Sequence, residues 1–119
     1  MKYLSKDTRP WGCYYVIHDE PNYKLKRIEV EPGGRLSYQY HHKRSETWTI
    51  INGKGIFTIN GKEEKVSSGK TLLIPCLSKH RIFNSGDDLL VIIEVQTGSY
   101  FGEDDIVRVE DDYNRNNEK

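Results

Sequence analysis

The sequence lacks an excess of charge of either sign, because Lys and Arg together number 18 and Asp and Glu also number 18. A balanced chain has no overall field to attract nucleic acid or an anionic membrane, so partners of these two classes are not expected. It also lacks a signal-peptide-like start and any transmembrane-length apolar run, which predicts a soluble, cytoplasmic protein. The expected ligand is a small molecule that is either neutral or bound through a local cluster of charged side chains.

Cysteine is scarce, and no window of the sequence shows a convincing helical period. Cys13 and Cys76 lie 63 positions apart without a CxxC spacing, so in a reducing compartment we expect free thiols. A chain of 119 residues is long enough for one hydrophobic core. We predict a single domain over residues 1–113 and a disordered polar tail over residues 114–119.

What the sequence does contain is a series of short runs rich in β-branched and aromatic residues. Examples are CYYVIH, YKLKRIEVE, TWTII, IFTIN and LLVIIEVQ. Asn52-Gly53 and Asn60-Gly61 predict hairpins, since type I′ turns need positive φ at both central residues. Seven to nine strands at this spacing predict an all-β fold, a sandwich or barrel of antiparallel strands.

Two of these runs carry polar residues on one face. In LLVIIEVQ both faces are apolar until Glu94 and Gln96 appear on one of them, which indicates a strand buried on both sides whose polar end opens into a cavity. The alternative is a strand end that emerges into water. Lys24 and Lys26 share a face of YKLKR, a pattern more typical of a solvated strand face than of a ligand rim. Trp11 is expected to pack rather than to stack on a substrate.

Four polar side chains with metal-binding chemistry fall in two β-rich segments. Because side chains alternate along a strand, Gln39 and His41 of SYQYHHKRSETW share one face. Glu46, Trp48 and Ile50 share the inward face of the next strand, and Glu46 is the only charged residue among them. An inward carboxylate needs a cation to offset the cost of its burial. His80, after the turn that Pro75 begins, supplies a second imidazole. Mixed nitrogen and oxygen donors suit Zn²⁺, and also Fe²⁺, Mn²⁺, Co²⁺ or Ni²⁺. The alternative to a metal site is that His41 lies at the solvent-exposed rim and that His80 is a core residue with its hydrogen bonds satisfied.

The spacing of these residues resembles the two motifs of the cupin superfamily. The first motif is matched at Gly33, Gln39, His41, Glu46 and Gly53, and the second at Gly69, Pro75, His80 and Asn84. Gln39 stands where most cupins have a histidine, and Leu77 replaces the usual glycine of the second motif. The resemblance implies a single cupin barrel, the double-stranded β-helix or jelly-roll fold, built from antiparallel strands.

A narrower resemblance covers nearly the whole chain. RPWGCYYVI, YKLKRIEVEPGGRLSYQYHHKRSETW, IPCLSKHRIFNSG and IEVQTGSYFGEDDIVRVEDDY are similar to the cupin domain of type II mannose-6-phosphate isomerases. That domain is usually the C-terminal half of bifunctional enzymes with a mannose-1-phosphate guanylyltransferase domain. Phosphomannose isomerases have a Gln/His/Glu/His zinc site, so the resemblance implies the ligands Gln39, His41, Glu46 and His80. The chain departs from the family pattern HxHRSEHW at Lys43 and Thr47, where relatives have histidines.

The resemblance implies metal-dependent isomerisation of a phosphorylated hexose, with mannose 6-phosphate to fructose 6-phosphate as the leading reaction, in activated-sugar and polysaccharide synthesis. One alternative is another cupin isomerase or epimerase of a sugar or sugar nucleotide. A second is a non-catalytic, sugar-binding regulatory cupin. We also expect a homodimer, because such barrels leave apolar sheet edges to cover.

Isomerisation also needs a base near the mobile proton and cations for the phosphate. Glu94 is the leading candidate base, since desolvation would raise its pKa, and His42 and Lys43 are rivals. Arg44 matches an arginine of the family motif and is the first choice for the phosphate. The other residues expected at the catalytic or substrate site are Lys43, Lys79, Arg81 and Gln96.

Overall fold

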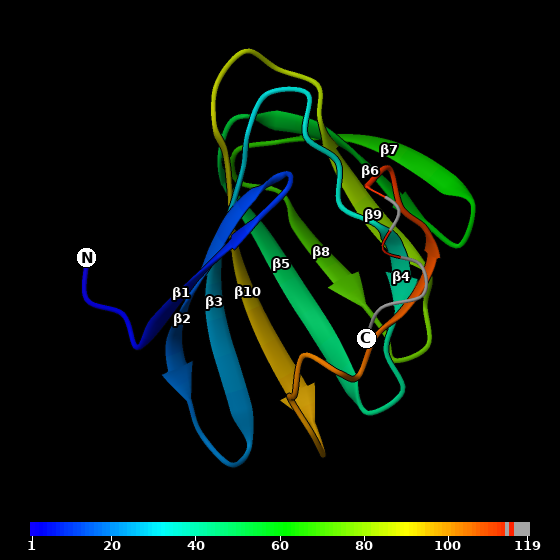
Figure 1. The fold of residues 1–119 in the computed structure, drawn as a ribbon. Helices are drawn as coiled ribbons and strands as arrows, with labels where there is room; N and C mark the ends of the chain where they lie inside the picture. The colour runs from blue at the N-terminus through cyan, green and yellow to red at the C-terminus, as the bar shows by residue number, and fades with distance from the viewer. Residues whose placement is uncertain (114, 116–119) are drawn as a thin grey trace.

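The computed structural model describes residues 1–113 and residue 115. In this part of the chain it has eleven strands and no helix (Figure 1). The strands are β1 (Ser5–Arg9), β2 (Gly12–Asp19), β3 (Tyr23–Val30), β4 (Tyr38–Tyr40), β5 (Arg44–Asn52), β6 (Lys54–Ile59), β7 (Lys62–Ser67), β8 (Thr71–Ile74), β9 (His80–Asn84), β10 (Leu90–Gly98) and β11 (Val107–Glu110). Apart from Arg115, the tail predicted over 114–119 lies outside the described residues.

The strands form two antiparallel sheets that face each other (Figure 1). The six-stranded sheet has the order β1-β2-β3-β10-β5-β8, and the five-stranded sheet has the order β11-β4-β9-β6-β7. The predicted all-β fold of antiparallel strands is confirmed. The predicted number of strands is too low, because β1, β7 and β11 are not among the predicted runs. The strands β1 and β7 have the mostly polar sequences SKDTR and KEEKVS, and β11 is the four-residue sequence VRVE with both valines exposed. All three lie at sheet edges and bury few apolar side chains, so the hydrophobic pattern does not reveal them.

Only one of the two Asn-Gly pairs forms the predicted hairpin. Asn60 and Gly61 have φ angles of 46° and 82° and connect β6 to β7, whose residues pair across the turn. The hairpin predicted at Asn52-Gly53 is wrong. There the chain crosses from one sheet to the other, since β5 pairs with β10 and β8 whereas β6 pairs with β7 and β9.

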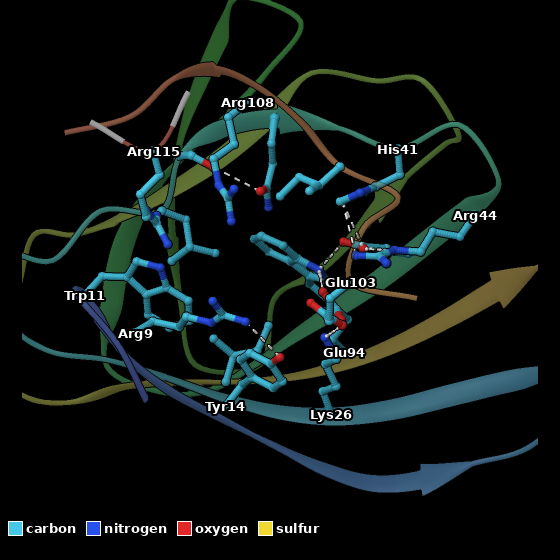
Figure 2. A pocket seen from close by; sticks show the side chains of 17 residues that line it. Arg9, Trp11, Tyr14, Lys26, His41, Arg44, Glu94, Glu103, Arg108 and Arg115 are labelled. Atoms are coloured by element: carbon cyan, nitrogen blue, oxygen red, sulfur yellow. Dashed lines mark hydrogen bonds and ion pairs between the residues drawn. The ribbon is translucent and has the colours of Figure 1, made fainter. Parts of the chain in front are cut away.

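The inward residues of three neighbouring strands change from apolar to polar along the barrel. On β3, β10 and β5, facing residues form three successive triplets: Ile28–Ile92–Ile50, Lys26–Glu94–Trp48 and Lys24–Gln96–Glu46. We call the part of the interior around the second and third triplets, together with His41 and His80, the polar end. It borders a cavity of about 100 Å³ (Figure 2).

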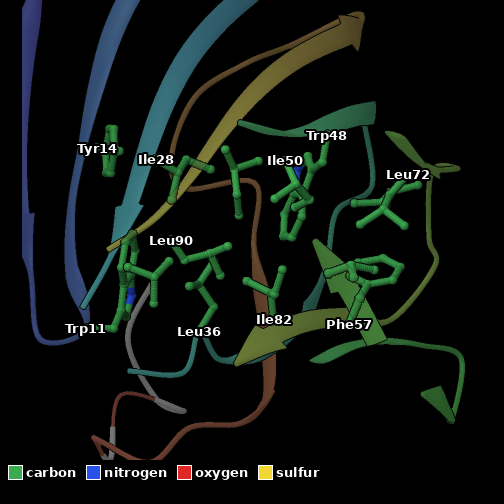
Figure 3. Packing of buried hydrophobic residues seen from close by; sticks show 14 of the residues in the cluster. Trp11, Tyr14, Ile28, Leu36, Trp48, Ile50, Phe57, Leu72, Ile82 and Leu90 are labelled. Atoms are coloured by element: carbon green, nitrogen blue, oxygen red, sulfur yellow. The ribbon is translucent and has the colours of Figure 1, made fainter. Parts of the chain in front are cut away.

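The rest of the interior, which we call the apolar end, is the hydrophobic core. Ile28, Ile50 and Leu90 from the six-stranded sheet point toward Leu36, Ile82 and Phe57 on the other side (Figure 3). Trp11 is 7% exposed and packs in this core, and it also lines the cavity. Burial of such side chains is the main favourable contribution to folding.

The polar faces predicted from the sequence have different outcomes. Glu94 and Gln96 are 4% and 0% exposed, so they lie inside the barrel and do not emerge into water. The solvated face predicted for Lys24 and Lys26 is wrong, since these lysines are 9% and 4% exposed. Both ammonium groups are ion-paired with Glu103, which belongs to the segment after β10.

No helix in the described residues is long and apolar enough to cross a membrane. Cys13 and Cys76 are free thiols.

Candidate metal centre

Three of the four predicted ligands meet at the polar end. His41 follows β4, Glu46 lies on β5, and His80 begins β9. One potential ligand atom from each lies within 4.8 Å of the others, and all three residues are buried. The Nε2 atom of His41 is 3.3 Å from Glu46 Oε2, and the Nε2 atom of His80 is 3.5 Å from Glu46 Oε1.

The Nδ1 atoms of both imidazoles are bound to backbone carbonyls, so both Nε2 lone pairs face Glu46, and His41 Nε2 also accepts from Arg44 Nη2 at 3.4 Å. His41 Nδ1 donates to the carbonyl of Asp105 at 2.6 Å, and His80 Nδ1 donates to the carbonyl of Ser78 at 2.8 Å. A carbonyl can only accept, so each ring carries its proton on Nδ1 and its lone pair on Nε2. The buried His80 Nε2 has no hydrogen-bond partner in the described part of the chain. An orphaned nitrogen aimed at a carboxylate fits a bound cation.

The local electrostatics favour the protonation states that metal binding requires. Burial, with the nearby Arg44 charge, lowers the pKa of His41 to about 4, so the ring is neutral at pH 7. Burial alone would raise the pKa of Glu46, but the neighbouring His80, His41 and Arg44 hold that pKa well below its usual range. Neutral imidazoles and an ionised carboxylate are the metal-binding forms of these groups.

Gln39, the fourth predicted ligand, borders the same cavity. It faces His80 directly across the pairing of β4 and β9. Its Oε1 atom accepts a hydrogen bond of 2.9 Å from Ser37 Oγ. The structure therefore places an amide oxygen on the wall that holds the two histidines, and its role as a ligand stays a prediction.

Glu94 lies beside Glu46, and the indole of Trp48 links them. Trp48 Nε1 donates to Glu94 Oε2 at 2.9 Å and is 3.1 Å from Glu46 Oε1. Gln96 Nε2 donates to the other Glu94 oxygen at 2.7 Å. Burial, reinforced by the negative charge of Glu46, raises the pKa of Glu94 to about 7. Glu94 is thus a buried carboxyl group that can lose or gain a proton near neutral pH.

Arg44 is the only one of the four predicted phosphate-binding cations that borders this cavity. Its Nε donates to Glu46 Oε2 at 2.8 Å. Lys43 and Lys79 are exposed and lie outside the cavity. Because His80 points inward, its neighbour Arg81 points to the outer face, where its Nη1 is 3.2 Å from Glu110 Oε2.

The segment from Ser99 to Ile106 forms a wall of the site that sequence patterns did not reveal. Its Asp105 accepts from the backbone N–H groups of His42 and Lys43, both at 2.9 Å, and its carbonyl orients His41. Burial opposes ionisation of Asp105, but these backbone donors lower its pKa. In the sequence the segment appears only within the family resemblance of IEVQTGSYFGEDDIVRVEDDY, which gives it no role, and its partners lie about 60 positions earlier.

The described chain also brings further cations to the cavity that were not among the predicted site residues. These are Arg9, Lys26, Arg108 and Arg115. They come from β1, β3, β11 and the residues after β11, so no single motif contains them.

Comparison with known families now identifies the domain. The model of the family described as mannose-6-phosphate isomerase C-terminal matches residues 1–111. The chain belongs to this family.

Curated relatives of the mannose-6-phosphate isomerase C-terminal family support the same assignment. The mannose-1-phosphate guanylyltransferase of Escherichia coli is 44% identical over 107 residues, which are 90% of this chain and 23% of the relative. The alginate biosynthesis protein AlgA of Pseudomonas aeruginosa is 45% identical over 90% of this chain and 22% of its own length. The chain therefore spans less than a quarter of these two relatives.

Solved structures agree on the fold. The capsular polysaccharide assembling protein CapF of Staphylococcus aureus aligns with a TM-score of 0.79 and 23% identity, over 91% of this chain and 34% of that one. A Klebsiella pneumoniae protein with a double-stranded β-helix domain aligns with a TM-score of 0.72 and 19% identity, over 82% and 83% of the two chains. At such identities the likeness shows the cupin fold alone.

The two departures from the isomerase-family pattern lie away from the cavity. Lys43 is exposed, with its Nζ 5.1 Å from the centre of the Tyr100 ring. Thr47 faces Leu73 across the pairing of β5 and β8, and Leu73 is 71% exposed on the outer face. The cavity wall therefore keeps Gln39, His41, Arg44 and Glu46 despite both departures.

Proposed function

We propose that this domain is a metal-dependent isomerase of a phosphorylated hexose, with mannose 6-phosphate and fructose 6-phosphate as the substrate pair. The observation that carries the proposal is the placement of Glu94, with a pKa of about 7, beside the cluster of His41, Glu46 and His80, at a cavity lined by Glu94, His41 and Glu46. Membership of the mannose-6-phosphate isomerase C-terminal family and relatives named for mannose-1-phosphate guanylyltransferase and alginate biosynthesis support a role in activated-sugar and polysaccharide synthesis.

The residues present fit a divalent metal ion, with His41, Glu46 and His80 as ligands and Gln39 as the fourth. We propose Zn²⁺, because the donors are two imidazoles, a carboxylate and an amide without a thiolate, a set that Fe²⁺, Mn²⁺, Co²⁺ and Ni²⁺ also accept. When bound, the ion would supply Lewis-acid stabilisation of negative charge on the sugar oxygens.

Glu94 then acts as the proton carrier. Its ionised carboxylate removes the proton from C2 of the aldose, and the electron pair of that bond moves toward C1 as an enediolate forms. The O2 hydroxyl proton passes to O1 as the C2 carbonyl forms, and the protonated Glu94 returns the first proton to C1, so the ketose forms without net gain or loss of atoms. Trp48 and Gln96 donate to the two carboxylate oxygens and hold the group in place. Arg44 anchors Glu46, which keeps the ligand carboxylate oriented.

A coupled assay that measures conversion of mannose 6-phosphate to fructose 6-phosphate tests the proposal. We expect the purified domain to contain about one metal ion per chain by elemental analysis and to turn over this substrate. His41→Ala, Arg44→Ala and Glu94→Gln should each lower kcat/KM by about 100-fold or more. His42→Ala is the matched control, because His42 is exposed and next to His41 in sequence, and it should retain activity.

Two results would contradict the proposal. A protein that takes up no metal after reconstitution lacks the metal centre. A protein that binds phosphosugars but converts none of them is a non-catalytic sugar-binding module. Turnover of a different sugar or sugar nucleotide would instead assign the site to another isomerase or epimerase.

The homodimer and the cytoplasmic location also stay predictions. The six-stranded sheet ends at β8, and its edge carries the exposed Leu73. Multi-angle light scattering should give twice the chain mass of 13.9 kDa for a homodimer, and the single chain mass would contradict it.

A further inference from the structure

The cavity is divided by charge. One side, which we call the metal side, contains His41, Glu46 and Glu94 and all of the lining carboxylates. There Glu46 pairs with Arg44, and Glu103 pairs with Lys26. Arg9, Arg108 and Arg115 lie on the other side of the cavity, with Trp11 (Figure 2). Three guanidinium groups therefore border a region of the cavity to which no described carboxylate contributes lining surface.

The acidic partners of two of these arginines hold them from outside the cavity. Arg9 Nη2 is 3.2 Å from Asp7 Oδ2, and it donates to the Tyr14 hydroxyl at 3.2 Å. Arg115 Nε and Nη2 donate to the two carboxylate oxygens of Asp111 at 2.9 and 3.1 Å. Neither Asp7 nor Asp111 lines the cavity. The aspartates thus fix the guanidinium positions of Arg9 and Arg115 without themselves lining the cavity.

Arg108 connects this side to the metal side. It faces Gln39 directly in the pairing of β11 and β4, and both side chains line the cavity. Residues opposite each other in antiparallel strands have Cβ atoms about 5 Å apart. A ligand in contact with the metal-side wall at one end can therefore reach the arginines at its other end.

We propose that Arg9, Arg108 and Arg115 form the subsite for the phosphate of the substrate, with the reacting carbons at the metal side. The inference rests on the proposed function and names the part of the cavity that recognises the phosphoryl group. A phosphate monoester carries close to two negative charges, and the planar, permanently charged guanidinium binds its oxygens in pairs. Arg44, the first choice from the sequence, lies on the metal side instead, where its Nε is 2.8 Å from Glu46 Oε2.

Binding of inorganic phosphate, measured by isothermal titration calorimetry, tests the subsite without relying on turnover. Arg9→Gln, Arg108→Gln and Arg115→Gln should each weaken phosphate binding by about 10- to 100-fold, which is the scale of one lost charged hydrogen bond. They should raise KM for mannose 6-phosphate more than they lower kcat. Arg27→Gln is the matched control, because Arg27 is an arginine outside the cavity that pairs with Glu29, and it should change neither value.

The failures of the two proposals are distinguishable. If phosphate binding depends on the three arginines but the protein has no isomerase activity, the phosphate subsite is supported and the proposed isomerase function is contradicted. Isomerase activity with KM and phosphate affinity unchanged in all three variants overturns the subsite. Crystals of the unmutated protein soaked in tungstate, a heavy phosphate analogue, provide a measurement free of folding defects. Tungstate at Arg9, Arg108 and Arg115 supports the subsite, whereas tungstate at Arg44 alone overturns it.

Discussion

The apolar and polar ends of the barrel are built on the same strands but contribute different properties. On β3, β10 and β5, the triplet Ile28–Ile92–Ile50 fills the core, and the next inward triplet along these strands is Lys26–Glu94–Trp48. Apolar burial stabilises the fold, whereas burial of charged groups costs several kcal/mol unless partners offset it. A shift of two residues along a strand thus separates side chains that stabilise the protein from side chains suited to chemistry.

The largest expected effect comes from His80→Ala at the polar end. Loss of this ligand should abolish stoichiometric metal binding and lower kcat/KM by about 1,000-fold, since one member of the charge-stabilising set is removed. The melting temperature of the metal-free protein should change little, because the apolar end is intact. Elemental analysis, the isomerase assay and thermal unfolding measure these three quantities. Full metal occupancy in this variant would contradict the ligand assignment.

Ile82→Ala, two residues further along β9, tests the apolar end. Ile82 is fully buried, so truncation should lower the free energy of unfolding by about 2–5 kcal/mol through lost burial and a residual cavity. Metal stoichiometry should not change while the variant is folded. Urea unfolding measures the loss, and Ile82→Val, with one methylene removed, should lose only about 1 kcal/mol. Equal effects of both variants would refute the core assignment.

Asp105→Ala tests the wall that orients the metal side. The variant removes the acceptor for the backbone N–H groups of His42 and Lys43, so the carbonyl at 105 should hold His41 less firmly. We expect metal affinity to fall by about 10- to 100-fold, as for other groups that orient ligands. Competition with a chromogenic chelator gives the dissociation constant. Asp104→Ala, which changes an exposed neighbour, should leave it unchanged.

The smallest effect concerns the pH dependence of the Glu103 ion pair. Burial opposes ionisation, but Lys26 outweighs it and lowers the pKa of Glu103 below the ordinary value of 4.5. The pair therefore stabilises the fold above that pH, and the contribution disappears as pH falls through the lowered pKa. Since the Glu103 side chain is 41% exposed, solvent screening limits the effect to about 1 kcal/mol or less.

Urea unfolding of Glu103→Gln and of the unmutated protein across pH 3–7 measures this contribution. The stability difference should be largest at neutral pH and should shrink below pH 4.5. Glu63→Gln on the exposed face of β7 is the control and should show no such dependence. A difference that grows on acidification would show that the pair does not stabilise the native state.

The sequence predicted the fold and the meeting of His41, Glu46 and His80 because strand alternation and motif spacing suffice for both. Alternation along a strand places Gln39 and His41 on one face, and the cupin spacing adds Glu46 and His80. The same reasoning predicted that Glu94 lies inside, where desolvation raises its pKa. These inferences need only the strand period and two motifs.

The remaining parts depend on contacts between distant residues. Lys26 is buried because Glu103, 77 positions later, pairs with it, and no local pattern contains that pair. Lysines are rarely buried, so the pattern YKLKR favours solvent unless the partner is known. Arg9 and Arg108 reach one cavity from opposite ends of the chain, which only the pairing of β11 with β4 and the packing of both sheets reveal.

The hydrogen bond from His41 Nδ1 to the carbonyl of Asp105 joins residues that are 64 positions apart, and this separation bears on the order in which contacts form during folding. Contacts of such separation form late, because loop closure costs entropy before the contact contributes. We therefore expect a refolding chain to bury Trp48 before the Ser99–Ile106 segment docks and completes the orientation of His41. In a stopped-flow experiment, uptake of Zn²⁺ should lag behind the change in tryptophan fluorescence, so that metal capture reports the final step of assembly.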